Sequence, residues 1–135
     1  MAQYLLDTNH ASPLVTLDHP LRQRVLAAIE DDHTFALPAI VVAELLFGYG
    51  LLPRAAQNVQ EWERLRPSFD VIAVEERDAL DAAAIRVRLR QQGWQLNVID
   101  ALIAVIALRY DLRLLTTDRD FDAVPDLHRE NWLTP

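Results

Sequence analysis

The sequence predicts an α/β protein with a mainly parallel, short-stranded central sheet flanked by helices. Short apolar segments alternate along the chain with longer segments that have helical spacing. Strands that alternate with helices form right-handed βαβ units and therefore a parallel sheet. Hydrophobic residues make up 51% of the 135 residues, which is enough to build a core. No internal repeat or linker-like change in composition is visible, so we expect one domain over residues 1–135.

The first part of the chain predicts two strands with helices between and after them. Residues 3–7 (QYLLD) are a short apolar run that ends in an acid, and a helix begins at Asn9. A second helix, opened by a proline in its first turn, covers about 20–31. Residues 34–37 (TFAL) are another short apolar strand, which a proline stops. The run 39–52 is apolar almost all round, as in a helix packed on a sheet or on a partner.

The rest of the chain continues the alternation. Residues 54–66 alternate charged and apolar positions at helical spacing, and 69–74 (FDVIAV) read as a strand. A long arginine-rich helix covers 76–91, and an alanine-rich helix covers 98–110. The predicted final segments are a strand and turn at 113–118 (RLLTTD) and an edge strand at 127–132 (LHRENW).

The composition excludes several kinds of chemistry. The chain has no cysteine, which excludes disulfides, zinc–thiolate sites and a cysteine nucleophile. All 13 Lys+Arg residues are arginines, which excludes Schiff-base chemistry, a lysine general base and a P-loop lysine. The net charge of −7 argues against broad electrostatic attraction to nucleic acid or to an anionic membrane. A nuclease function would therefore require bound cations that reverse the field locally.

The ends and the hydropathy of the chain predict a cytoplasmic protein without a membrane segment. The N-terminus lacks the basic region and apolar stretch of a signal peptide. No apolar run approaches the ~20 residues needed to cross a bilayer. The absence of cysteine is compatible with an intracellular location.

Four acids occupy positions that suggest a shared site. Asp7 directly follows an apolar strand, Glu44 is the single charge in its apolar helix, and Asp100 lies between apolar pairs. Asp118 follows an apolar strand after two threonines. An ionised carboxylate buried without a partner costs several kcal/mol, so such groups are usually paired or bound to metal. The carboxyl ends of parallel strands near a topological switch point bind ligands, and Asp7 and Asp118 would both lie there.

Each acid also has a structural interpretation. Asp7 and Asp100 are placed to cap or satisfy the first turn of a helix. Glu44 alone would fit a salt bridge to an arginine, and Asp118 with Asp120 and Asp122 would fit a solvated turn. The four acids together favour one metal site. Mg²⁺ binds through a few carboxylates, water and substrate phosphate. Two such ions ~3.5–4 Å apart activate the attacking water and stabilise the leaving oxygen of a phosphodiester.

Four segments, in order along the chain, resemble the motifs of PIN-domain nucleases, most closely the VapC-type toxins of prokaryotic toxin–antitoxin pairs. These segments are 5–9 (LLDTN), 42–45 (VAEL) with Gly48, 99–104 (IDALIA) and 115–121 (LTTDRDF). The resemblance runs from residue 3 to about 132. Each motif is weak singly, but the four in this order and spacing are fairly specific.

The resemblance implies a PIN-like fold and a Mg²⁺-dependent endoribonuclease, with Mn²⁺ as a possible alternative. It makes Asp7 and Asp100 the principal metal ligands, and Glu44 and Asp118 complete the catalytic acidic pocket. The supporting residues that it implies are Thr8 and Thr116, which order the site or the phosphate, and Asp120, where the family pattern varies; it assigns no role to Asp122. The implied partners are an RNA substrate, a second copy in a homodimer, and a cognate antitoxin in a toxin–antitoxin hetero-oligomer.

The helices within 40–66 carry more apolar side chains than one sheet face can readily absorb. By resemblance, an antitoxin segment would dock there as a helix in a groove; the alternative is packing within the chain. The four histidines fall in predicted loops or element ends, so we expect surface positions for His10, His19, His33 and His128.

Two other functions fit parts of the pattern. A haloacid-dehalogenase-like phosphohydrolase would use Asp7 as a nucleophile, but it needs a second aspartate where this chain has Asn9, and a lysine for the phosphate. A non-catalytic regulatory or protein-interaction module would keep the acids as a structural metal site. RNA cleavage that depends on metal distinguishes the nuclease from both.

Overall fold

The computed structural model describes residues 1–133, and its centre is a five-stranded parallel sheet with the strand order β3-β2-β1-β4-β5. The strands are β1 (Gln3–Leu6), β2 (Thr34–Pro38), β3 (Asp70–Ile72), β4 (Arg113–Leu115) and β5 (Arg129–Glu130). The helices are α1 (Thr8–Ala11), α2 (Pro20–Glu30), α3 (Ala39–Gly50), α4 (Ala55–Leu65), α5 (Glu76–Gln91) and α6 (Val98–Arg109). The predicted α/β class with a parallel, short-stranded sheet is confirmed.

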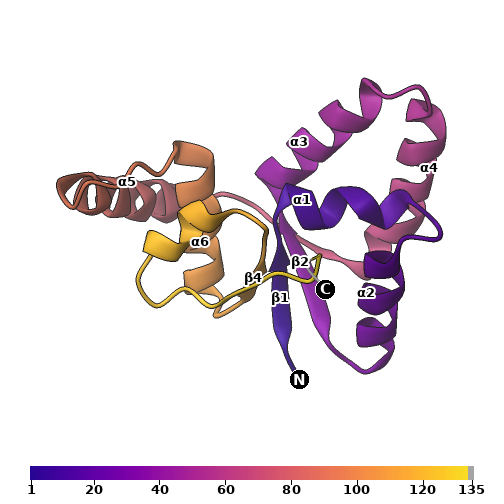
Figure 1. Ribbon diagram of the computed structural model, residues 1–135, viewed down its shortest axis with the longest axis horizontal. Helices are drawn as coiled ribbons and strands as arrows, with labels where there is room; N and C mark the ends of the chain where they lie inside the picture. The colour runs from indigo at the N-terminus through magenta and orange to yellow at the C-terminus, as the bar shows by residue number, and fades with distance from the viewer. Residues whose placement is uncertain (134–135) are drawn as a thin grey trace.

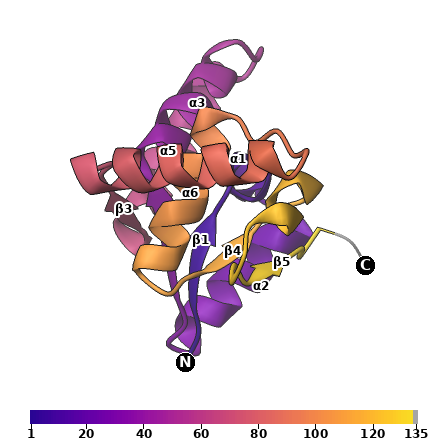
Figure 2. The same cartoon turned by 90° about the vertical axis from the view of Figure 1, so that its left-hand side faces the viewer.

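Helices cover both faces of the sheet. Figure 1 shows α5 and α6 on one side and α2 with the α3–α4 hairpin on the other, and Figure 2 shows α5 lying across α6. The chain places β2 and β3 on one side of β1 and later returns to place β4 and β5 on the other. The switch in direction therefore falls between β1 and β4, where Leu5 pairs with Leu114 and Leu6 with Leu115. Ligands bind at the carboxyl ends of the strands at such a point.

The core lies on both sides of β1 and β4. Leu5, Leu6, Leu114 and Leu115 are all fully buried, as expected for strands with helices on both faces. Each such side chain contributes about 1.5–3 kcal/mol through burial. The alanine-rich helix α6 is buried on most of its surface, because its small side chains let it approach the sheet closely. This packing fixes the N-terminal end of α6, which carries Asp100, beside the carboxyl edge of the sheet.

A buried ion pair joins α5 to α6. Arg109 Nε lies 3.0 Å from Asp78 Oδ1, and these two side chains are 11% and 1% exposed. The same guanidinium lies 2.8 Å from Glu75 Oε2. Asp78 also accepts the backbone N–H of Glu75 at 2.8 Å, within a capping box that opens α5. The pair holds α6 against a helix that contributes nothing to the acidic pocket itself.

The ends of several elements differ from the prediction. The edge strand expected at 127–132 is limited to Arg129–Glu130, and the strand expected at 69–74 to Asp70–Ile72. The helix expected from Asn9 is a single turn that continues as a 3₁₀ helix, Ser12–Val15. A further 3₁₀ helix, Arg119–Ala123, follows Asp118 where only a turn was expected. Among residues 1–133, no helix is both long and apolar enough to span a membrane.

The expected surface position of the histidines is wrong for His10, which is fully buried in α1. His19 and His33 are partly buried, and His128 is exposed. His19 caps α2 by accepting the backbone N–H of Leu21 at 3.1 Å. His33 accepts the backbone N–H of Ala2 at 3.0 Å. The imidazoles of His19 and His33 thus each accept a hydrogen bond from a backbone N–H.

The helices of the segment 40–66 divide their apolar residues between two environments. Leu45, Tyr49, Trp62 and Leu65 are buried within the chain. Others stay exposed around the tip of the α3–α4 hairpin: Leu46, Phe47, Leu51 and Leu52. Packing within the chain therefore accounts for one face of the hairpin and leaves the other apolar and exposed.

Candidate active site

A pocket of about 630 Å³ lies at the carboxyl edge of the sheet. Four acids line it: Asp7, Glu44, Asp100 and Asp118. Asp7 follows β1, and Asp118 comes three residues after the end of β4, while the other two stand on α3 and α6. The pocket is completed by Thr8, Asn9, Ser12, Asn97, Val98 and Ile99. The fold thus brings together four acids that lie far apart in the sequence.

The carboxylate of Asp7 is held in a fixed orientation. Its Oδ1 accepts the backbone N–H of Thr8 at 2.8 Å, at the start of α1. Its Oδ2 accepts the hydroxyl of Thr116 at 2.7 Å and the side-chain amide of Asn9 at 3.2 Å. Asp7 is only 7% exposed, and its backbone N–H donates to Leu115 O at 3.0 Å, which continues the sheet. The capping interpretation of Asp7 therefore holds together with a place in the pocket.

Thr116 connects Asp7 to Asp118. Its hydroxyl is buried, donates to Asp7 and accepts the backbone N–H of Asp118 at 3.0 Å. Asp118 in turn caps the following 3₁₀ helix, because its Oδ1 accepts the backbone N–H of Asp120 at 2.8 Å. One threonine thus sets the relative positions of two acids that follow the neighbouring strands β1 and β4.

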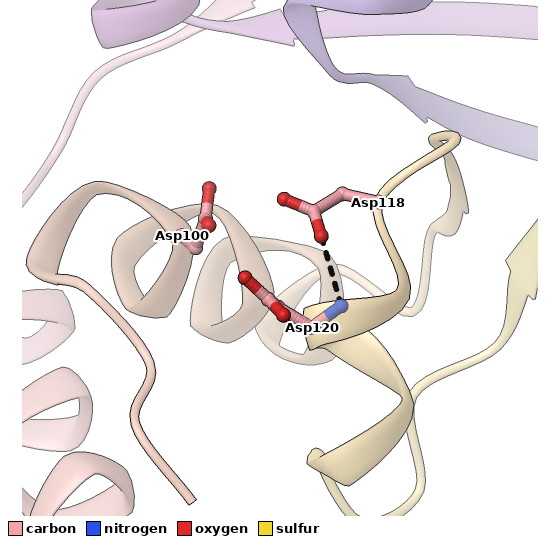
Figure 3. Close-up of side chains that lie close together, drawn as sticks. All are labelled: Asp100, Asp118 and Asp120. Carbon is pink, nitrogen blue, oxygen red and sulfur yellow. Dashed lines mark hydrogen bonds between the residues drawn. The ribbon is translucent and has the colours of Figure 1, made fainter.

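Asp100 lies in the first turn of α6, and Asn97 is the N-cap of that helix. Asn97 Oδ1 accepts the backbone N–H of Asp100 at 2.8 Å, and its side-chain amide donates to Asp100 Oδ2 at 2.9 Å. The cap of the helix is therefore Asn97, which leaves the Asp100 carboxylate directed to the pocket. Figure 3 shows Asp100 beside Asp118 and Asp120, and single ligand atoms of the three lie within 4.8 Å of one another.

The four acids that line the pocket and the neighbouring Asp120 repel one another. No basic side chain of residues 1–133 forms an ion pair with any of them. Burial, followed by the charges of Asp7 and Asp118, raises the pKa of Asp100 from its ordinary 3.8 to about 6. Burial and the charge of Asp7 raise the pKa of the Glu44 carboxyl. The side chain of Glu44 is exposed and has no arginine partner among the described residues, so the salt-bridge interpretation is not supported.

The donor set fits a divalent cation. Its oxygen ligands are carboxylates and its excess charge is negative, and both features suit Mg²⁺ or Mn²⁺. The hydroxyl of Thr8 is buried, borders the pocket and has no hydrogen-bond partner among the described residues. Asp122 does not belong to this set, because its carboxylate pairs with Arg129.

Sequence reasoning did not single out three polar residues of the pocket: Asn9 as a partner of Asp7, Ser12, and Asn97. The first and last carried a usable signal. Asn9 lies two residues after a strand-ending acid, and Asn97 lies three residues before the Asp100 of a helix's first turn, which is N-cap spacing. Ser12 gave no signal, because only the meeting of α1 with α3 and α6 places it at the pocket.

This chain is thus an α/β protein with a parallel sheet, and the acids that converge at the switch point of that sheet form a candidate metal site. The PIN domain matches residues 4–127, and the chain belongs to this family. It is 26% identical over 130 residues to Ribonuclease VapC2 of Rickettsia felis, a match that covers 96% of this chain and 97% of that protein. The match to the PIN family argues against the dehalogenase-like alternative.

Two solved structures show the same likeness. VapBC2 from Rickettsia felis, bound to a DNA fragment from its promoter, contains a chain with a TM-score of 0.84 and 25% identity, over 96% of this chain and 98% of that one. FitAcB from Neisseria gonorrhoeae has a TM-score of 0.74 and 30% identity, over 95% and 96% of the two chains. The resemblance to VapC-type PIN proteins seen in the motifs is confirmed.

Proposed function

We propose that this chain is the toxin of a toxin–antitoxin pair and a Mg²⁺-dependent endoribonuclease. The observation that carries the proposal is the convergence of carboxylates at the switch point of the sheet, where no basic side chain of residues 1–133 pairs with them. Similarity to a protein named Ribonuclease VapC2 supports RNA as the substrate. The pocket opens to solvent at Glu44, whose side chain is exposed, so a substrate can approach the acids from this side.

Asp7, Asp100 and Asp118 would hold the cation, with Glu44 as a further ligand, direct or through water. Asp120 joins the proposed set because its carboxylate lies with those of Asp100 and Asp118. A bound Mg²⁺ or Mn²⁺ supplies Lewis-acid activation of water and neutralises charge on the phosphodiester.

The chain's own residues orient the site. Thr116 and Asn9 keep Asp7 in one rotamer through hydrogen bonds to Oδ2. Asn97 does the same for Asp100. The hydroxyl of Thr8, which is buried and has no hydrogen-bond partner among residues 1–133, would order the site or the phosphate. A carboxylate of the pocket that the cation leaves uncoordinated would accept the proton of the attacking water.

Incubation of the purified protein with RNA and with a small phosphomonoester, in Mg²⁺, Mn²⁺ or EDTA, tests the proposal. We expect endonucleolytic cleavage of RNA in either metal, none in EDTA, and no release of phosphate from the monoester. Phosphate release from the monoester would indicate a phosphohydrolase. Metal binding without any RNA cleavage would indicate the non-catalytic module.

The proposed partner is a cognate antitoxin that docks on the α3–α4 hairpin within 40–66. Phe47 and Leu51 are 70% and 71% exposed there, and Glu44 on the same helix faces the acidic pocket. An antitoxin segment on this surface reaches the pocket, where an arginine or lysine competes with the metal for the carboxylates. Inhibition by an antitoxin peptide with no basic residue near the site would contradict that competition.

We also propose a homodimer within the toxin–antitoxin hetero-oligomer, which light scattering of the isolated chain and of the complex would measure.

A further inference from the structure

The buried imidazole of His10 links the end of the chain to the acidic pocket. Its Nε2 accepts the backbone N–H of Trp132 at 3.0 Å, across 122 residues of sequence. Its Nδ1 lies 2.7 Å from Asn9 Oδ1. A backbone amide can only donate, so Nε2 carries no proton and the hydrogen of the ring is on Nδ1. Trp132 therefore selects one tautomer, which donates to Asn9.

The orientation of the Asn9 amide follows from its neighbours. The backbone N–H of Thr117 points at one end of this amide at 3.2 Å, so the atom at that end must be the oxygen. The same oxygen receives the Nδ1–H of His10. The nitrogen is then turned to Asp7 Oδ2 at 3.2 Å and to Thr116 Oγ1 at 3.4 Å. With two donors on its oxygen, the amide cannot flip without opposing two N–H groups to its own NH₂.

The segment that supplies the Trp132 N–H is itself anchored. The Trp132 ring packs edge-on against Tyr4 with centroids 4.9 Å apart, and the Arg24 guanidinium lies 3.9 Å from the ring centroid. Its indole N–H donates to Glu130 Oε1 at 3.1 Å. Glu130 belongs to β5, whose pairing with β4 ties the segment to the sheet. The donor that selects the His10 tautomer is therefore held on the sheet that also positions Asp7.

We propose that His10 is a positioning residue for Asp7: the Trp132 amide fixes the imidazole tautomer, the imidazole fixes the Asn9 amide, and the amide fixes the carboxylate for metal binding. The inference rests on the proposed function in one respect, which is that Asp7 is a metal ligand. Residues that orient a metal ligand through hydrogen bonds typically change metal affinity by about 10–100-fold when they are replaced.

Two isosteric variants separate the two hydrogen bonds of the ring. In His10→Asn, the side-chain amide nitrogen takes the place of Nδ1, so the donor to Asn9 is kept and the acceptor for Trp132 is lost. In His10→Gln, the amide reaches the place of Nε2, so the acceptor is kept and the donor is lost. Both variants leave a polar side chain in the same buried space, so both should lose some stability. A difference in Mn²⁺ affinity between them therefore reports which hydrogen bond was lost.

The measurement is Mn²⁺ affinity by calorimetry, at a temperature where circular dichroism shows all proteins folded. We expect His10→Gln to lose roughly tenfold or more in affinity and His10→Asn to lose less than about threefold. If the wild type binds Mn²⁺ and cleaves RNA, equal losses of Mn²⁺ affinity in the two variants, or a larger loss in His10→Asn, would overturn this inference alone. Wild-type Mn²⁺ binding without RNA cleavage would overturn the proposed nuclease alone, and no binding by the wild type would overturn both.

A second measurement does not depend on either variant folding or on metal. Long-range ¹H–¹⁵N spectra of the ¹⁵N-labelled wild-type protein report which ring nitrogen of His10 carries the hydrogen. The inference requires the hydrogen on Nδ1 at neutral pH. A hydrogen on Nε2 would contradict the hydrogen bond to Trp132 and with it the whole chain of contacts.

Discussion

Removing the charge of Asp100 should stabilise the metal-free protein while removing a proposed metal ligand. The fold raises the pKa of Asp100 from 3.8 to about 6, with burial as the main cause and the neighbouring acids as the next. The folded state therefore favours the protonated carboxyl. Its contribution to stability is full below the unfolded pKa and is lost as the pH rises from about 3.8 through about 6.

The magnitude follows from that difference in pKa. Taken in full, it corresponds to at most ~3 kcal/mol at neutral pH. Because Asp100 is only partly buried and solvent screens its neighbours, we expect about 1–2 kcal/mol. In EDTA at pH 7.5, Asp100→Asn should be more stable than wild type by this amount, and the difference should shrink toward zero near pH 4.

Urea denaturation of both proteins at the two pH values measures the difference. Asp122→Asn is the matched control, because that acid pairs with Arg129 outside the pocket and its replacement should not stabilise the protein. Millimolar Mg²⁺ should reverse the order at pH 7.5, since the wild type gains stability from binding and the variant gains little. An Asp100→Asn protein that is less stable than wild type in EDTA, or equally altered at both pH values, would refute the electrostatic reasoning.

Three further outcomes test other parts of the account. Mn²⁺ should raise the melting temperature of the wild type above its value in EDTA, and an unchanged value at millimolar metal would contradict a preformed acidic pocket. Arg109→Met should lower the free energy of unfolding by about 3–5 kcal/mol, because it leaves Asp78 buried and unpaired; adding Asp78→Leu should recover part of the loss in the same denaturation assay. Phe47→Glu should weaken antitoxin binding in calorimetry and leave metal-dependent RNA cleavage unchanged, whereas unaltered binding would exclude the α3–α4 hairpin as the docking surface.

Local patterns were sufficient to predict the architecture. The runs that end at Leu6 and Leu115 are short and apolar because their strands are covered on both faces, and that signal is carried entirely by neighbouring residues. The alternation of such runs with helices fixes a parallel sheet. Because Asp7 directly follows its strand, it can be placed at the carboxyl edge of the sheet before the other residues of the pocket are known. The ends of the elements were predicted less well. Strand β5, for example, has only two residues, which is too short to show a periodic pattern.

The parts that local patterns missed depend on contacts between distant residues. His10 was expected at the surface because the residues near it in the sequence give no sign of its contact with Trp132. That contact forms when the chain returns to the sheet and β5 pairs with β4. Spacing alone makes Asp120 part of a solvated turn, and only the family resemblance made it a supporting residue; the 3₁₀ helix that brings it beside Asp100 depends on the cap that Asp118 supplies. Glu44 was seen only as the single charge of an apolar helix, and the structure exposes its side chain at the pocket.

In the proposed function, the carboxylates of the pocket hold a metal with which the chain cleaves RNA. Its most direct test is the cleavage of one labelled RNA in Mg²⁺ by wild type, Asp100→Asn and Asp122→Asn, each shown to be folded. Both substitutions remove one negative charge, but Asp100 lines the pocket and Asp122 pairs with Arg129. We expect cleavage by wild type and by Asp122→Asn and none by Asp100→Asn. Undiminished cleavage by Asp100→Asn would contradict it.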